Sequence, residues 1–257
     1  MTLLARSMHD IRYDADHDEI LVTNPFSQAV LVFRGSADGE EAPLRVIQGP
    51  RSQIPDYVDR LDVDPVHDEI FLPAGDHILV FPRTGNGDVA PLRVIRGPKT
   101  ELLGARTLTI DPVHDLIIAA GPTEVGWGEL GEGEGNAYIS IFNRIDKGDV
   151  KPIRMIRGPR TGLAGRVRIN QIQVYPEKGW IVVTQPGPYD SIEPKDVFIG
   201  VWHINNDGDV PPRWKISGSK TGMMKPRGVA LDPTHKELLV ADMRRNSIFV
   251  YFFPEMF

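Results

Sequence analysis

The feature that most constrains this chain is a repeat. The stretch VDPVHDEIFL, which begins at Val63, returns as YDADHDEILV at Tyr13, IDPVHDLIIA at Ile110 and LDPTHKELLV at Leu231. A less regular copy, VYPEKGWIVV, begins at Val174. Repetition with a period of about 50 residues is typical of folds that stack one structural unit several times. One such unit cannot bury its own apolar faces, so its neighbours must cover them.

Two further signatures follow the repeated stretch. One is an apolar run that ends in an aromatic residue, and these aromatics are Phe33, Phe81, Phe142, Trp202 and Tyr251. The other signature occurs in four copies and is a segment such as GDVAPLRVIRGP, which begins at Gly87. The fifth copy ends in YFFPEMF and has no segment of this kind.

Each full unit therefore holds four short apolar runs, rich in Val, Ile, Leu and Phe and separated by Gly, Pro, Asp and Asn. Such runs predict strands and are too short for helices. Four strands per repeat are typical of a propeller blade. We predict an all-β fold, a β-propeller of four-stranded antiparallel blades with five repeats, in which residues 1-257 form a single β-propeller domain. A six-bladed ring, with sequence missing from this chain, is the alternative.

The last repeat resembles a known family. The stretch KPRGVALDPTHKELLVADMRRNSIFVY, from Lys225 to Tyr251, is similar to the repeat of the bacterial NHL-repeat-like β-propeller family. The matching residues are Pro226, Gly228, Val229, Asp232, Val240, Ala241, Asp242, Asn246, Ile248 and Tyr251. The other four copies keep the spacing but few of these residues. The resemblance implies a propeller of the kind that usually closes with six blades, whereas this sequence contains five repeats.

The repeat also explains a polar cluster that looks like a metal or acid–base site. His17, His67, His114 and His235 hold the same position in four copies, with acidic residues beside them. A catalytic group need occur only once, whereas a turn must be made in every blade. Asp-Pro followed by polar residues predicts a tight turn, because Asp accepts local backbone N–H groups and Pro fixes φ. We therefore interpret these histidines as turn residues.

Residues that differ from blade to blade are better candidates for a site. At the start of the innermost strands the aligned residues are His9, Asp59, Arg106, Asn170 and Arg227. We expect them at the mouth of the central channel, either as a binding site for a small anionic ligand or as a hydrated pore lining. No metal site is predicted, because a divalent cation needs several converging oxygen ligands and the arginines oppose it. The metal-dependent chemistry of related six-bladed propellers is therefore not expected here.

Two connections between second and third strands are enlarged and break the repeat. They are GPTEVGWGELGEGEGN, residues 121–136, and QPGPYDSIEPKD, residues 185–196. They belong to neighbouring blades and share one face of the predicted propeller, and loops on a rigid scaffold often carry function. Trp127, Glu129 and Tyr189 are the candidate partner-binding residues in these loops. The alternative interpretation is a flexible, solvated insertion.

These observations predict a non-enzymatic binding or scaffold protein that uses its loop face for a protein, a glycan or a small ligand. The alternative is a lyase- or hydrolase-type enzyme at the channel mouth, with His9 as base and Arg106 or Arg227 binding an anion. The sequence holds no coherent catalytic set, which favours the binding protein. No cofactor is predicted.

Composition narrows the choice of partners. The formal net charge is -6 and the basic residues are scattered, so no nucleic-acid partner is expected. No stretch approaches the roughly 18 to 20 apolar residues of a membrane helix, so membrane insertion is not expected. The absence of cysteine excludes disulfides and thiolate sites. The sequence leaves open the oligomeric state and the compartment: extracellular or periplasmic if a signal peptide was removed, cytoplasmic otherwise.

Overall fold

The computed structural model describes residues 8–58, 60–122, 137–163, 169–187 and 196–257. These residues form five antiparallel sheets, numbered here as blades 1 to 5 in chain order. Blade 1 contains β1 (Ile11–Asp14), β2 (Glu19–Asn24), β3 (Ala29–Arg34) and β4 (Arg45–Gln48), and blade 2 contains β5 (Asp62–Asp64), β6 (Glu69–Pro73), β7 (His77–Pro82) and β8 (Arg93–Arg96). Blade 3 contains β9 (Thr107–Asp111), β10 (Leu116–Pro122), β11 (Ala137–Asn143) and β12 (Arg154–Arg157). Blade 4 contains β13 (Ile172–Tyr175), β14 (Trp180–Gln185), β15 (Phe198–His203) and β16 (Trp214–Ser217), and blade 5 contains β17 (Pro226–Asp232), β18 (Glu237–Asp242) and β19 (Ser247–Phe252).

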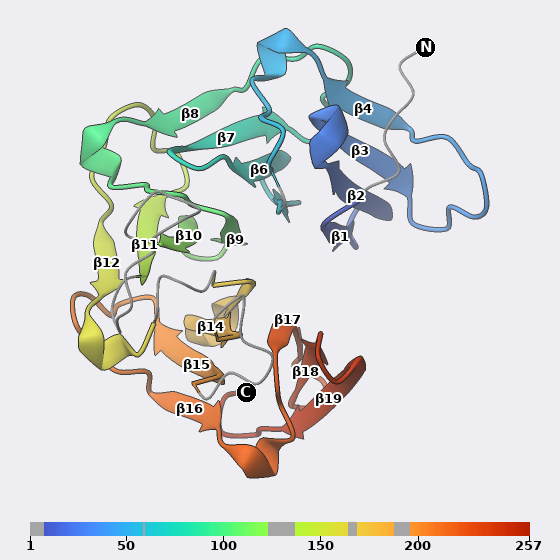
Figure 1. Ribbon diagram of the computed structural model, residues 1–257. Helices are drawn as coiled ribbons and strands as arrows, with labels where there is room; N and C mark the ends of the chain where they lie inside the picture. The colour runs from blue at the N-terminus through green and yellow to red at the C-terminus, as the bar shows by residue number, and fades with distance from the viewer. Residues whose placement is uncertain (1–7, 59, 123–136, 164–168, 188–195) are drawn as a thin grey trace.

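The blades are arranged in a ring, with the first strand of each blade toward the centre and the fourth strand at the periphery (Figure 1). The ring is open between blade 1 and blade 5 (Figure 1). The predicted all-β propeller with five repeats is therefore confirmed. Four strands are present in blades 1 to 4, and the described part of blade 5 has three. In the described part of the chain, no helix is long and apolar enough to cross a membrane.

Short 3-10 turns connect several strands. They are η1 (Pro25–Ser27), η2 (Pro50–Ser52), η3 (Pro98–Thr100), η4 (Pro159–Thr161), η5 (Pro176–Lys178) and η6 (Ser219–Thr221). Four of them follow a fourth strand and end in Ser or Thr, whose hydroxyl donates to the carbonyl of the Gly three residues earlier. This local bond fixes the sharp bend by which the chain leaves the rim and runs back toward the channel.

The repeated histidines are turn residues, as the sequence indicated. In blade 2 the Asp64 carboxylate accepts the backbone N–H of His67 (3.0 Å) and contacts its imidazole Nδ1 (2.8 Å). The pairs Asp14–His17, Asp111–His114 and Asp232–His235 repeat this geometry. Each histidine therefore braces its own turn between the first and second strands.

The core lies between the blades. Four apolar clusters each join two adjacent blades; for example, Val30 and Val32 of blade 1 pack with Leu72 and Phe81 of blade 2. The aromatic that ends each third strand packs toward the preceding blade, so Phe81 and Phe142 are fully buried. Each blade thus needs a neighbour on both faces, as a repeat fold requires.

The two faces at the opening have no such neighbour among the described residues. Ile248 and Val250 of blade 5 are 69% and 53% exposed, whereas Val30 and Val32, which hold the same positions in blade 1, are 0% exposed. On the other side of the opening, Ile11 of β1 is 61% exposed. The exposed apolar side chains of blade 5 and of blade 1 therefore lie on the two kinds of sheet face that pack together wherever two blades are neighbours.

The buried aromatics allow a direct test of this packing. Phe81→Ala should lower the free energy of unfolding by about 3 to 5 kcal/mol, because a buried Phe leaves a cavity when it is truncated. Phe33→Ala is the matched control, since Phe33 holds the same position but faces the opening and is only partly buried. Chemical denaturation should show a clearly smaller loss for Phe33→Ala; equal losses would contradict the open ring.

Candidate functional site at the mouth of the central channel

The innermost strands position the side chains at the channel. Each inner strand is the edge of its sheet, so its outward N–H groups need acceptors from elsewhere. The preceding blade supplies them at three junctions. The Asp10 carboxylate accepts the Leu61 N–H (3.1 Å), the Asp62 carboxylate accepts the Ile110 N–H (2.9 Å), and the Gln171 amide oxygen accepts the Val229 N–H (2.9 Å).

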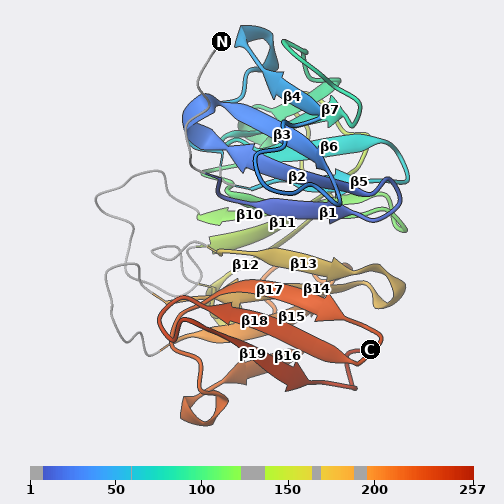
Figure 2. The same cartoon turned by 90° about the vertical axis from the view of Figure 1, so that its right-hand side faces the viewer.

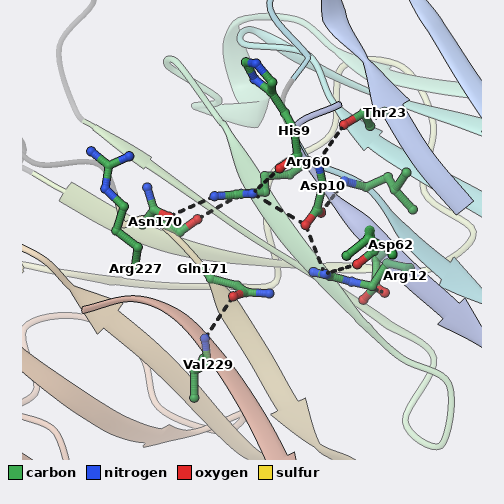
Figure 3. Close-up of polar contacts among 12 residues, drawn as sticks. His9, Asp10, Arg12, Thr23, Arg60, Asp62, Asn170, Gln171, Arg227 and Val229 are labelled. Atoms are coloured by element: carbon green, nitrogen blue, oxygen red, sulfur yellow. Dashed lines mark hydrogen bonds and ion pairs between the residues drawn. The ribbon is translucent and has the colours of Figure 1, made fainter. Parts of the chain in front are cut away.

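Arg60 of blade 2 links blade 1 to blade 4 (Figure 3). Its guanidinium donates to the Asn170 side-chain oxygen (2.8 Å) and to the Asn170 backbone oxygen (3.2 Å). The same group donates to the His9 carbonyl (3.0 Å) and lies 3.5 Å from the Asp10 carboxylate. Arg60 is therefore a brace across the channel that joins blade 2 to blades 1 and 4.

Asp10 is the buried acid of this network and is 8% exposed. Its carboxylate lies 3.3 Å from the Arg12 guanidinium, which also donates to Asp62 (3.2 Å). Burial raises the pKa of Asp10, and the positive charges of Arg12 and Arg60 offset this only in part. Two arginines and two aspartates thus neutralise one another at the channel wall.

The structure disperses the candidate residues that the sequence aligned. Asn170 and the backbone of His9 meet at Arg60, but the His9 imidazole points away from it and lies edge-on to Phe26, with ring centroids 6.2 Å apart (Figure 3). Arg227 is the second residue of β17, and its carbonyl accepts the Thr184 hydroxyl (3.2 Å). Asp59 lies outside the described residues.

Arg106 lies at another part of the mouth, near Tyr57. Burial raises the pKa of the Tyr57 phenol, and the positive charge of Arg106 partly offsets that rise. The Arg106 N–H donates to the Ala120 carbonyl (3.2 Å), which holds the start of β9 against β10. The role of all five aligned residues in ligand binding stays a prediction.

Sequence reasoning missed Arg60, the residue that organises the mouth. Arg60 lies one residue after the position that the sequence analysis chose. In the five blades that next position holds Asp10, Arg60, Thr107, Gln171 and Gly228, so it varies between blades as much as the chosen one. The same criterion of variation within a repeat would have selected it. Its reach across the ring depends on the length of an arginine side chain and on the ring geometry, which the alignment does not contain.

The charged network around Arg60 has a structural role at the channel mouth. Asp10, Arg12, Arg60 and Asp62 are all engaged with each other or with backbone groups. Within the described ranges, no three His, Asp or Glu side chains converge in a way that could hold a metal ion. The candidate partner residues Trp127, Glu129 and Tyr189 lie outside the described residues.

The described ends of the two enlarged connections lie at the channel-mouth end of the strands. β10 ends and β11 begins on either side of the first connection, and β14 and β15 flank the second. In Figure 2 these strand ends share one side of the propeller with the start of β17. The described residues that flank both connections therefore lie beside the channel mouth.

Comparison with known proteins gives the fold class. No protein-family model matches the sequence, and no curated protein matches it. Among solved structures, hydrazine synthase from Kuenenia stuttgartiensis is similar, with a TM-score of 0.63 and 12% identity over 93% of this chain. This chain corresponds to 56% of the length of that one. At this identity the likeness shows the fold alone: the protein is a five-bladed β-propeller.

The Arg60 brace predicts a pH-dependent loss of stability. Arg60→Met should lower the free energy of unfolding by about 1 to 3 kcal/mol at neutral pH, because it removes a partner from a buried carboxylate. Arg51→Met is the control, since Arg51 is exposed and only its backbone N–H is engaged, by Asp88. Denaturant unfolding at several pH values measures both variants.

The direction of the pH effect follows from Asp10. Its pKa is raised in the fold, so protonated Asp10 favours the native state, and this contribution is lost as the pH rises through the folded pKa. Removing Arg60 raises that pKa further, because Arg60 lowers it. The deficit of Arg60→Met should therefore be largest near neutral pH and shrink in acid. A deficit that grows in acid would contradict the assignment.

Proposed function

We propose that this chain is a non-enzymatic binding or scaffold protein that recognises a protein, a glycan or a small ligand through its loop face. The observation that carries the proposal is the Arg60 brace. It uses the charged side chains of Arg60 and Asp10 to join blade 2 to blades 1 and 4, so these two groups serve the scaffold. A rigid ring of this kind is suited to present variable loops.

The departures from the repeat support the loop face as the binding surface. Blades 1 to 4 repeat the same four-stranded pattern, whereas residues 121–136 and 185–196 enlarge two connections in adjacent blades. A scaffold that needed only to be stable would have no use for such differences. The aromatic and acidic residues Trp127, Glu129 and Tyr189 are the contacts we propose within these loops.

The finer family assignment also belongs to this proposal. The match of Lys225–Tyr251 to the NHL-type repeat supports membership of that group of bacterial propellers. The competing function is a lyase- or hydrolase-type reaction at the channel mouth, for which the exposed His9 is the candidate base. The two functions place the ligand on different residues, so variants can separate them.

The test compares two variants in one screen. In the first, residues 123–136 are replaced by a short Gly-Asn turn; in the second, Arg227 is changed to Gln. A glycan array and a thermal-shift screen of small anions first identify a ligand of the wild type. The loop variant should lose at least about tenfold in affinity with an unchanged melting temperature, and Arg227→Gln should bind like the wild type. The reverse pattern would contradict the proposal and favour chemistry at the channel mouth.

A further inference from the structure

The fourth strand is added to every complete blade in the same way. The carbonyls of Val32, Val80, Ile141 and Val201 in the third strands accept the N–H groups of Leu44, Leu92, Ile153 and Arg213 at 2.7 to 2.8 Å. Val250 of β19 holds the equivalent position in blade 5. Among the described residues no strand pairs with that side of β19, which is the edge of a three-stranded sheet. An unpaired edge is a template for an added strand.

The segment that precedes each fourth strand also clasps the blade before it. In blade 3, the Gly148 N–H donates to the Val94 carbonyl (2.7 Å), and its carbonyl accepts from Arg96 (3.0 Å). The next residue, Asp149, accepts the Lys99 N–H (2.7 Å). Gly87–Asp88 and Gly208–Asp209 repeat these bonds on blades 1 and 3. One Gly-Asp pair therefore ties each of the three junctions between blades 1 and 4 at the rim.

The equivalent clasp position on blade 4 is unfilled in the described part of the chain, where Ile216 is only partly buried. Ile216 of β16 corresponds to Ile95, which bridges to Gly148, but no residue in the described ranges makes that bridge to Ile216. A Cβ placed on Gly97 would lie 2.5 Å from the Asp149 carboxylate, whereas a Cβ on Gly218 would have nothing within 4 Å. In blades 2 to 4 one segment fills both equivalent positions, and no strand or bridge of the described residues occupies the edge of β19 or the clasp position on β16.

Charge also specifies what fits this site. In blades 1 and 2 a Glu at the start of the second strand pairs with the Arg of the fourth strand: Glu19 with Arg45 (2.6 Å) and Glu69 with Arg93 (2.5 Å). Glu237 holds that position in blade 5, and no described arginine pairs with it. The site therefore presents a carboxylate where an incoming strand would carry an arginine.

We propose that the β19 edge of blade 5, together with the β16 rim of blade 4, binds an extended segment of a partner polypeptide as a fourth strand. The segment has the order Gly-Asp, then Pro, then Arg followed by an aliphatic residue two positions later. This recognition mode is β-strand addition, in which main-chain hydrogen bonds supply affinity and side-chain positions supply specificity. A second copy of the chain is not the occupant, because its own segments of this type pair within its own blades.

The probe is a synthetic peptide, GDVAPLRVIRGP, which is the sequence of Gly87–Pro98, added to the intact 257-residue protein. Isothermal titration or fluorescence anisotropy should show saturable one-to-one binding. A scrambled peptide of the same composition should not bind. A peptide with Asp changed to Ala should bind at least about threefold more weakly, because it loses the rim contact. Absence of saturable binding by the native peptide would overturn the proposal.

Variants of the protein locate the site. The N–H and carbonyl of one residue in an antiparallel strand point to the same side, so the Val250 N–H points outward like its carbonyl. Val250→Pro removes this N–H, and proline is tolerated on an edge strand. Val250→Thr keeps that N–H and is the matched control. The peptide should bind Val250→Pro at least about tenfold more weakly than Val250→Thr, at equal melting temperature. Equal affinities for the two variants would overturn the proposal.

Two further measurements stay informative if Val250→Pro does not fold. A peptide with N-methyl leucine lacks the N–H that would reach the Val250 carbonyl and should lose binding to the wild type; retained binding would contradict strand addition. Changing the first peptide Arg to Gln should weaken binding to the wild type and should have no effect on Glu237→Gln. An equal effect on both proteins would place that arginine elsewhere. These outcomes do not depend on the loop face, so they can fail while its function stands.

Discussion

The contact between neighbouring blades is the interaction on which the structure depends. Each sheet is apolar on both faces, so no blade is stable until another covers it. The third-strand residues Val30 and Val80 are fully buried for this reason, and Phe81 and Phe142 of the following blades close the same two contacts from the other side. Hydrogen bonds then fix the geometry. At the channel, inner-strand side chains accept backbone N–H groups of the next blade, and at the rim the Gly-Asp pairs form hydrogen bonds with the backbone of the previous blade.

Much of this architecture could be predicted from sequence because it repeats. The strand pattern, the five blades and the Asp–His turns each recur, so a chance resemblance in one copy is corrected by the others. The channel network could not be predicted in the same way. Arg60 meets Asn170 across the ring, 110 positions away in the chain, and only the circular arrangement of the blades brings them together. The dispersal of His9, Arg106 and Arg227 has the same cause, because an aligned position in a ring points in five different directions.

Function in such a scaffold is to be sought where the repeat is broken. The enlarged connections break the repeat in the sequence of two neighbouring blades, and the described part of the fifth blade has three strands where the other blades have four. These two features differ physically. The connections offer side chains on loops, whereas β19 offers backbone groups and the apolar side chains of Ile248 and Val250. The two proposed sites would therefore recognise their partners in different ways, the loops by side chains and β19 by strand addition.

The most direct test of the account is amide hydrogen exchange measured residue by residue in the unliganded protein. The third-strand amides of Val32, Val80, Ile141 and Val201 face a fourth strand and should be strongly protected. The Val250 amide should exchange at least about a hundredfold faster, because exchange at an unpaired edge needs no opening of the sheet. Protection of Val250 equal to that of the other four would show that its edge is already paired, and would contradict an open fifth blade.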